Sequence, residues 1–233
     1  RIDANLLGIS MEDLHMLNKK LFNEKIVKLQ NKTTGTLIIK EYPTASASVN
    51  HYRALVNELA LKRTFKPDII FVDYINICAS SRFKPGANVN SYTYVKAIAE
   101  EMRGLAVELD VPIVTATQTT RSGFVSSDIG LEDTSESFGL PATADFMFAL
   151  ISSEELERAG QMLVKQLKNR YNDPTVNRKF IIGVDRARMK LFDIEQQAQN
   201  LIQPEQEKYV EHNLEKTEES PEEKYKKFQD FKF

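Results

Sequence analysis

The sequence predicts an α/β fold: a mainly parallel sheet flanked by helices, then a C-terminal antiparallel extension and a polar tail. Three observations indicate this class. Short apolar runs rich in β-branched residues, typical of strands in a parallel sheet, alternate with helical patterns in the first part of the chain. Consecutive strand patterns then follow one another, as in an antiparallel meander. The last residues are rich in Glu, Gln and Lys and poor in core-forming side chains.

The composition is that of an ordinary globular protein. The chain has 233 residues, of which 42% are hydrophobic and 27% charged, enough for one sizeable domain and a tail. A formal charge of −2 neither indicates nor excludes nucleic-acid binding, because a few loop cations in a channel suffice. The single Cys78 excludes a disulfide framework and a multi-cysteine zinc site. No apolar run is long enough to cross a bilayer, so we expect a cytoplasmic protein without membrane contacts.

Helical patterns occupy the N-terminal part of the chain and the segments between strands. Residues 1–31 carry Leu and Ile at roughly helical spacing, and Ser10 followed by Asp13 is a candidate helix start. A second pattern covers Asn50 to Arg63, and the clearest helix is predicted over Tyr92 to Leu109. The apolar face of that last helix consists of Val95, Ile98, Ala99, Met102, Leu105, Ala106 and Leu109.

The predicted strands begin with a short one over Thr36 to Lys40. The run Ile69 to Val72 is unbroken and apolar, which predicts a strand buried on both faces. Val111 to Thr117 and Phe146 to Ile151 are further apolar strands. After a short charged helical stretch, the expected meander consists of Met162 to Arg170, Lys179 to Val184 and Met189 to Ile194.

Two polar loops separate these elements, one over residues 77–90 and a Ser/Gly-rich one over residues 118–139. Loops as long as the second are usually functional or disordered. We expect residues 1–195 to form one domain and residues 196–233 to be a mostly disordered tail.

A carboxylate follows the first long apolar run. Asp73 comes directly after Ile69 to Val72, at the carboxyl end of the strand, where open α/β sheets bind ligands. In P-loop NTPases an aspartate at this place holds the magnesium of the nucleotide. The alternative, that Asp73 only caps a turn, stays open because the pattern is short.

Two further groups suit phosphate chemistry. Gln118 follows the next strand and could approach the same edge as Asp73, where an amide can bind a γ-phosphate or an attacking water. Lys168 and Arg170 are two positions apart on a strand and therefore point to one face, which suits neutralising a phosphoryl group, also in a neighbouring subunit. The simpler alternatives are a loop cap for Gln118 and a solvated hairpin tip for the cations.

The order of these motifs resembles the RecA-like motor domain of replicative hexameric helicases of the DnaB-like superfamily. The matching stretches are Arg1 to Asn5, Ile69 to Tyr74, Tyr92 to Glu101, Gly139 to Met147 and Lys165 to Tyr171. The resemblance covers roughly residues 1–195. It implies an ATP-dependent replicative motor that translocates on single-stranded DNA and unwinds duplex in the 5'-3' direction, with ATP and Mg²⁺ as cofactors. The implied partners are single-stranded DNA and further copies in a hexameric ring, with primase and a helicase loader as candidates. The implied location is the cytoplasm, that of the host if a phage encodes the chain.

The resemblance also implies roles for individual residues. Asp73 matches the Walker B aspartate, which holds Mg²⁺ through water, and Gln118 matches the sensor glutamine at a strand end. Lys168 and Arg170 match the basic finger pair that reaches the nucleotide of the adjacent subunit.

Residues 77–90 and 119–137 match the two family loops that face the ring channel and hold single-stranded DNA. The cations in them that are expected to contact phosphates are Arg82, Lys84 and Arg121. Bacterial relatives carry an arginine before the Glu of the second loop, whereas this chain has Ser135 before Glu136, so that DNA contact is not carried over.

One family motif is absent. The sequence contains no Gly-x-x-x-x-Gly-Lys-Ser/Thr loop, and no acidic residue can be assigned the role of the family's catalytic glutamate. We therefore expect the carboxyl-terminal part of a helicase, cut within its motor domain, that does not hydrolyse ATP alone. Two alternatives stay open: a recombinase-type RecA-like ATPase, and a non-catalytic binding protein that retains the fold. The missing loop favours the latter, and the joint presence of Asp73, Gln118 and Arg170 argues against it.

Overall fold

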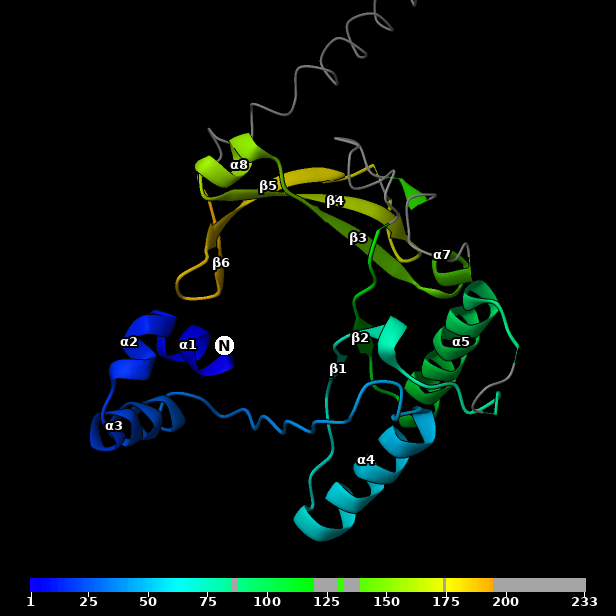
Figure 1. Cartoon of the computed structure of the whole chain (residues 1–233), viewed down its shortest axis with the longest axis horizontal. Coiled ribbons are helices and arrows are strands. Elements are labelled where there is room, and N and C mark those ends of the chain that lie inside the picture. The colour runs from blue at the N-terminus through cyan, green and yellow to red at the C-terminus, as the bar shows by residue number, and fades with distance from the viewer. Residues whose placement is uncertain (85–87, 120–129, 132–138, 174, 195–233) are drawn as a thin grey trace, which may run out of the picture.

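The structure is a computed structural model that describes residues 1–84, 88–119, 130–131, 139–173 and 175–194 (Figure 1). Two sheets are present in this part of the chain: a two-stranded parallel sheet and a four-stranded antiparallel sheet. The predicted α/β class is therefore confirmed, although the parallel part is smaller here than the sequence predicts. No helix in the described residues combines the length and apolarity needed to span a bilayer. The predicted tail, residues 196–233, lies outside the described residues.

The N-terminal helical pattern forms three separate helices. They are α1 (Ile2–Leu7), α2 (Met11–Met16) and α3 (Lys19–Gln30). The first break falls at Gly8, whose φ of 65° ends α1 in the left-handed conformation that glycine tolerates. The predicted start at Ser10 is confirmed, because its hydroxyl oxygen accepts a hydrogen bond from the backbone N–H of Asp13 at 3.0 Å.

The predicted strand at Thr36 to Lys40 is wrong. The segment carries no strand, and Leu37 and Ile39 are 60% and 68% exposed. The physical reason is that a β-branched run becomes a strand only where a neighbour completes its hydrogen-bond ladder, and no described segment pairs with it. The chain instead runs extended from α3 to α4 (Val49–Arg63), which confirms the second helical pattern (Figure 1).

The parallel sheet pairs β1 (Ile70–Val72) with β2 (Ile113–Thr115), so that Val72 lies opposite Thr115. Both strands were predicted. The expected burial on both faces is wrong, since Phe71 is 69% exposed. In the described residues this sheet has only its two strands, so the side chains of the outward face have no second layer against them.

The core is built around α5 (Ser91–Leu109), which confirms the clearest predicted helix. Its apolar face packs against α4, the short helix η1 (Ile75–Ile77) and α7 (Gly139–Thr143). The buried members of this cluster are Val49, Ile75, Cys78, Val95, Ile98, Ala99, Met102, Leu105 and Leu140. Because α5 contacts the sheet as well as α7, it fixes the position of both regions considered below.

The antiparallel sheet has the order β3-β4-β5-β6. Its strands are β3 (Phe146–Ile151), β4 (Gln161–Asn169), β5 (Lys179–Asp185) and β6 (Lys190–Asp193), with α8 (Glu154–Arg158) between the first two. The predicted meander is confirmed. The turn that joins β5 to β6 also touches the N-terminal helices, where the backbone N–H of Met11 donates to Ala187 O at 3.1 Å.

Candidate functional site

Asp73 and Gln118 lie at the same edge of the parallel sheet, as predicted. The parallel register places the ends of β1 and β2 side by side, and the Thr115 hydroxyl donates to Val72 O across this edge at 2.8 Å. Gln118 reaches back over it, because its Nε2 donates to the hydroxyl of Tyr74, the neighbour of Asp73, at 3.3 Å. Two polar groups of the predicted kinds therefore lie at the edge where α/β sheets bind ligands.

The surroundings of Asp73 fit a magnesium ion held through water. The residue is exposed, and no other described residue engages its carboxylate. Mg²⁺ usually takes one or two carboxylates and fills its other positions with water and phosphate oxygens. The described residues contain no group of three or more His, Cys, Asp or Glu that could hold a metal, so Asp73 belongs to no protein-only metal cage in this part of the chain.

Lys168 and Arg170 lie together at the C-terminal end of α7, which confirms that they share one face. The Lys168 ammonium bonds to the carbonyl oxygen of Pro141, and Arg170 Nη2 donates to Ala142 O at 2.8 Å. Carbonyl groups at a helix end lack partners within the helix and favour cations. Arg170 Nη1 also forms an ion pair of 3.0 Å with Asp145 Oδ1, and 45% of the Arg170 side chain remains exposed.

Arg103 joins this cluster and was not predicted. It projects from α5, and its Nη1 pairs with Asp145 Oδ2 at 2.6 Å and donates to Thr143 O at 2.8 Å. Hydrogen bonding to Arg103, with a smaller contribution from Arg170, holds the pKa of Asp145 below its ordinary value. Burial and the nearby Arg170 charge lower the pKa of Lys168. No sequence signal links Arg103 to Asp145, because 42 positions separate them.

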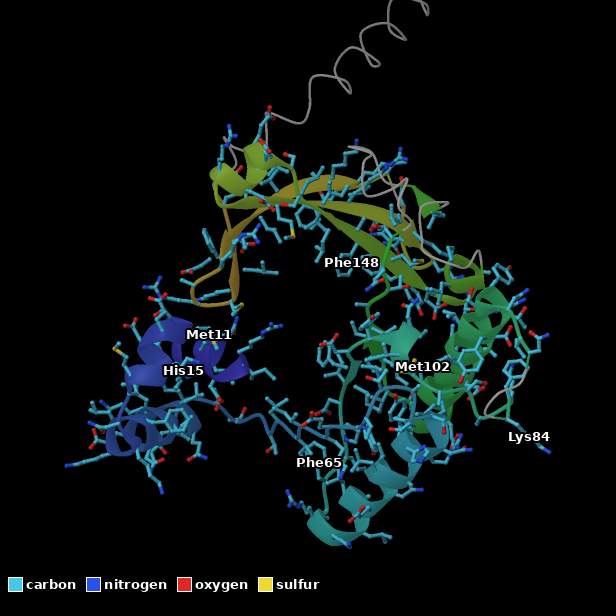
Figure 2. The ribbon with its side chains drawn as sticks, viewed as in Figure 1. Met11, His15, Phe65, Lys84, Met102 and Phe148 are labelled. Carbon is cyan, nitrogen blue, oxygen red and sulfur yellow. The ribbon has the colours of Figure 1, made fainter. Side chains whose placement is uncertain are left out.

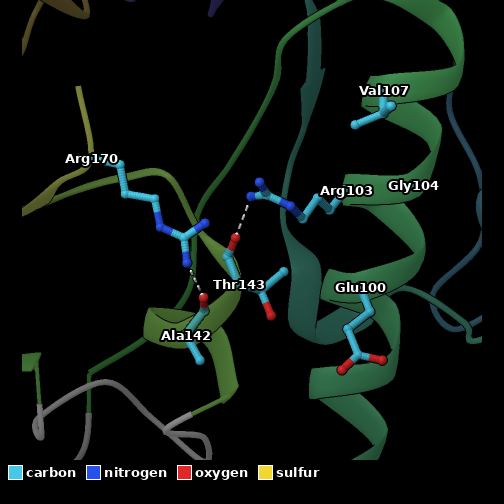
Figure 3. A pocket seen from close by; sticks show the side chains of 7 residues that line it. All are labelled: Glu100, Arg103, Gly104, Val107, Ala142, Thr143 and Arg170. Atoms are coloured by element: carbon cyan, nitrogen blue, oxygen red, sulfur yellow. Dashed lines mark hydrogen bonds between the residues drawn. The ribbon is translucent and has the colours of Figure 1, made fainter.

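An open pocket of about 460 Å³ lies between α5 and α7. Its lining residues are Glu100, Arg103, Gly104, Val107, Ala142, Thr143 and Arg170. Figure 3 shows the Arg103 and Arg170 side chains reaching toward the end of α7 from opposite sides. In the described residues no contact joins this pocket to Asp73 or Gln118, so the two predicted groups form separate sites on one chain.

The three predicted DNA contacts differ in their surroundings. Arg82 Nη1 pairs with Glu100 at 2.5 Å, so a phosphate would compete with a carboxylate for this side chain. Lys84 is exposed and projects away from the body of the protein (Figure 2). Arg121 lies outside the described residues. The DNA contacts stay predictions.

Glu101 of α5 holds the start of the loop that carries Arg82 and Lys84. Its carboxylate accepts hydrogen bonds from the Ser80 hydroxyl at 2.5 Å, the Ser81 hydroxyl at 2.6 Å and the Ser81 backbone N–H at 2.9 Å. Only 7% of the Glu101 side chain is exposed. The loop that carries Arg82 and Lys84 therefore leaves the core from a defined point.

Comparison with solved structures defines the class of the fold. One solved ATPase domain matches with a TM-score of 0.66 at 17% identity, over 83% of this chain and 68% of that one. A DnaB-like replicative helicase, solved in a study of its interactions with primase, matches with a TM-score of 0.65 at 17% identity, over 83% of this chain and 46% of that one. The fold is therefore that of a RecA-like ATPase domain of the DnaB type.

The family follows from sequence. The model of the DnaB-like helicase C terminal domain matches residues 4–219, and the chain belongs to this family. The DnaB-like replicative helicase of Enterobacteria phage T4 is 48% identical over 199 residues, which are 84% of this chain and 42% of the relative. A probable plasmid replicative DNA helicase of Chlamydia muridarum (strain MoPn / Nigg) is 32% identical over 124 residues, 52% of this chain and 25% of the relative. The resemblance seen in the motifs is confirmed, and the chain spans less than half the length of these relatives.

Proposed function

We propose that this chain is part of an ATP-dependent replicative DNA helicase that translocates on single-stranded DNA and unwinds duplex in the 5'-3' direction. The observation that carries the proposal is that Asp73 and Gln118 lie at the same carboxyl edge of the parallel sheet in a member of the DnaB-like family. Asp73 would hold Mg²⁺, which offsets the charge that develops on the phosphates of ATP. Gln118 would orient the attacking water and register the loss of the γ-phosphate.

The finger pair supports a ring as the working form. Lys168 and Arg170 share no contact with the Asp73 edge in the described residues, which suits two groups that serve different nucleotides. With ATP between subunits, the pair would enter from the neighbour, and the head-to-tail contact would close into a hexamer. Because the primase study concerns a relative with this fold, primase is a candidate partner of the ring, with a loader as another.

The intact protein tests this function on a forked duplex. We expect strand displacement that requires ATP, Mg²⁺ and a 5' single-stranded tail. Strand exchange on a filament, without displacement at the fork, would instead identify a recombinase-type ATPase. Binding of DNA with neither reaction would identify a non-catalytic binding protein.

The chain alone is expected to show no ATP hydrolysis above background, because its sequence contains no loop to hold the phosphates against Asp73. The measurement is phosphate release from Mg-ATP by the purified 233-residue chain. The control is Asp73→Asn. Hydrolysis that this substitution abolishes would contradict the expectation, whereas hydrolysis that survives it belongs to a contaminant.

The chain alone is expected to bind single-stranded DNA weakly and with strong salt dependence, through the exposed Lys84. We expect Lys84→Ala to weaken binding of oligothymidylate about fivefold, or ~1 kcal/mol. The slope of log K against log salt should fall by about 0.7, the value of one phosphate contact. Fluorescence anisotropy measures both quantities. Lys66→Ala, an exposed lysine outside the loop, is the matched control, and equal losses in both variants would refute a specific role for Lys84.

A further inference from the structure

The pocket between α5 and α7 gathers more positive charge than the finger pair alone. Arg103 comes from α5, whereas Lys168 and Arg170 come from β4 and its end, and all bond to the segment 141–145. Asp145 lies between the two arginines and binds each with a different carboxylate oxygen, at 2.6 Å and 3.0 Å. The backbone N–H of Arg170 also donates to Asp145 O at 3.0 Å, so this residue is held by main chain and side chain together.

The charge of this cluster is not balanced. Three cations face one carboxylate, and Glu100, the one acid among the described residues that line the pocket, already pairs with Arg82 at 2.5 Å. A guanidinium has five N–H donors. In the described residues Arg103 bonds through Nη1 alone and Arg170 through one bond from each Nη, so donors remain on both side chains. The carboxylate of Asp145 orients the two guanidinium groups and leaves some of their N–H donors available for a ligand.

We propose that Arg103 is a third cation of this site and, with Lys168 and Arg170, binds the terminal phosphates of a nucleoside triphosphate presented by the adjacent subunit. Asp145 is the positioning residue that holds both guanidinium groups at the rim of the pocket. A polyphosphate concentrates several charges within a few ångströms, which matches cations gathered around one carboxylate. A single-stranded backbone spreads one charge per nucleotide and matches this cluster less well. The inference rests on the proposed function and adds a residue from a different element to its finger pair.

Calorimetry of the 233-residue chain with tripolyphosphate at low salt tests the site without a phosphate loop or a neighbour. Loss of one charge-assisted contact predicts that Arg103→Ala weakens binding about tenfold, as Arg170→Ala does. Arg103→Lys keeps the charge but not the fork, so its affinity should fall between those of Arg103→Ala and the unmodified chain. The matched control is Arg158→Ala, which removes an exposed arginine that pairs with Glu154 within α8.

Each result of these titrations either supports the phosphate site or overturns it. Tripolyphosphate affinity that Arg103→Ala leaves unchanged, or that the unmodified chain lacks, overturns the site. Titration with oligothymidylate separates the two sources of phosphate: equal losses for both ligands would assign Arg103 to DNA and overturn the nucleotide assignment. Thermal melting followed by circular dichroism shows whether Arg103→Ala is folded, and if it is not, Arg103→Lys decides. The helicase proposal is tested independently, by ATP-dependent strand displacement of a forked duplex by the intact protein, which does not depend on the tripolyphosphate titration.

Discussion

Leu105→Ala is expected to lower the free energy of unfolding by about 3 kcal/mol, through the lost transfer free energy and the cavity left behind. Leu105 is 0% exposed and belongs to the face of α5 on which the core is built. Because α5 contacts α4, the sheet and α7, few neighbours are free to collapse into the vacated space.

Urea denaturation followed by circular dichroism measures this change, with the slope m unchanged if the unfolded state is unaffected. Val107→Ala is the matched control, two positions away on the same helix and 75% exposed. We expect it to change the free energy by less than about 0.5 kcal/mol. A similar small value for Leu105→Ala would show that α5 is not the packing centre of the chain.

Glu101→Ala is expected to lower the free energy of unfolding by about 2 kcal/mol, because it removes a carboxylate that is only 7% exposed and leaves its three hydrogen-bond donors without this acceptor. The donors are the Ser80 hydroxyl and the hydroxyl and backbone N–H of Ser81. Without the hydrogen bonds to Glu101, the start of the loop that carries Lys84 is no longer held in place. We therefore expect the variant to bind oligothymidylate more weakly, although the substitution makes the chain more positive. Tighter binding would show that charge, and not loop position, governs this contact. Glu155→Ala, an exposed carboxylate of α8, is the control for charge alone.

The Glu101 carboxylate also makes the free energy of unfolding depend on pH, in a direction that follows from its pKa shift. Burial by itself raises the pKa of Glu101, but the hydrogen bonds from Ser80 and Ser81, with backbone donors, outweigh it and leave the pKa below the ordinary 4.5. A lowered folded-state pKa means that the stabilisation is complete above the ordinary value and is lost as pH falls through the folded one. The stability difference between the unmodified chain and Glu101→Gln, which cannot titrate, should therefore shrink below about pH 4.5. A difference that stays constant down to about pH 3 would contradict this assignment.

Patterns that repeat along the chain were predictable from sequence. The apolar face of the Tyr92 to Leu109 helix was correct because helical burial depends on positions three and four apart. The shared edge of Asp73 and Gln118 could also be predicted, since parallel strands joined by a helix end on the same side of a sheet. Lys168 and Arg170 reach the same end of α7, as their two-residue spacing predicts, although Arg170 lies one residue beyond the end of β4.

Features that depend on a partner far away in the sequence could not be predicted from it. Thr36 to Lys40 has the composition of a strand, but no described neighbour completes its ladder. The apolar neighbours of Phe71 predict burial, but its exposure depends on how many layers cover the sheet. Arg103 lies on the polar side of a helix, where most arginines are merely solvated.

The amino-acid sequence by itself determined the α/β class, the helices α4 and α5 and the strand ends that carry Asp73 and Gln118, because each is specified by residues close together in the chain. Only the tertiary structure decided that Glu101 fastens the loop and that Asp145 joins Arg103 to Arg170. Ion pairs and buried acceptors depend on distances of a few ångströms between segments far apart in sequence, and those distances exist only once α5, α7 and β4 are packed together.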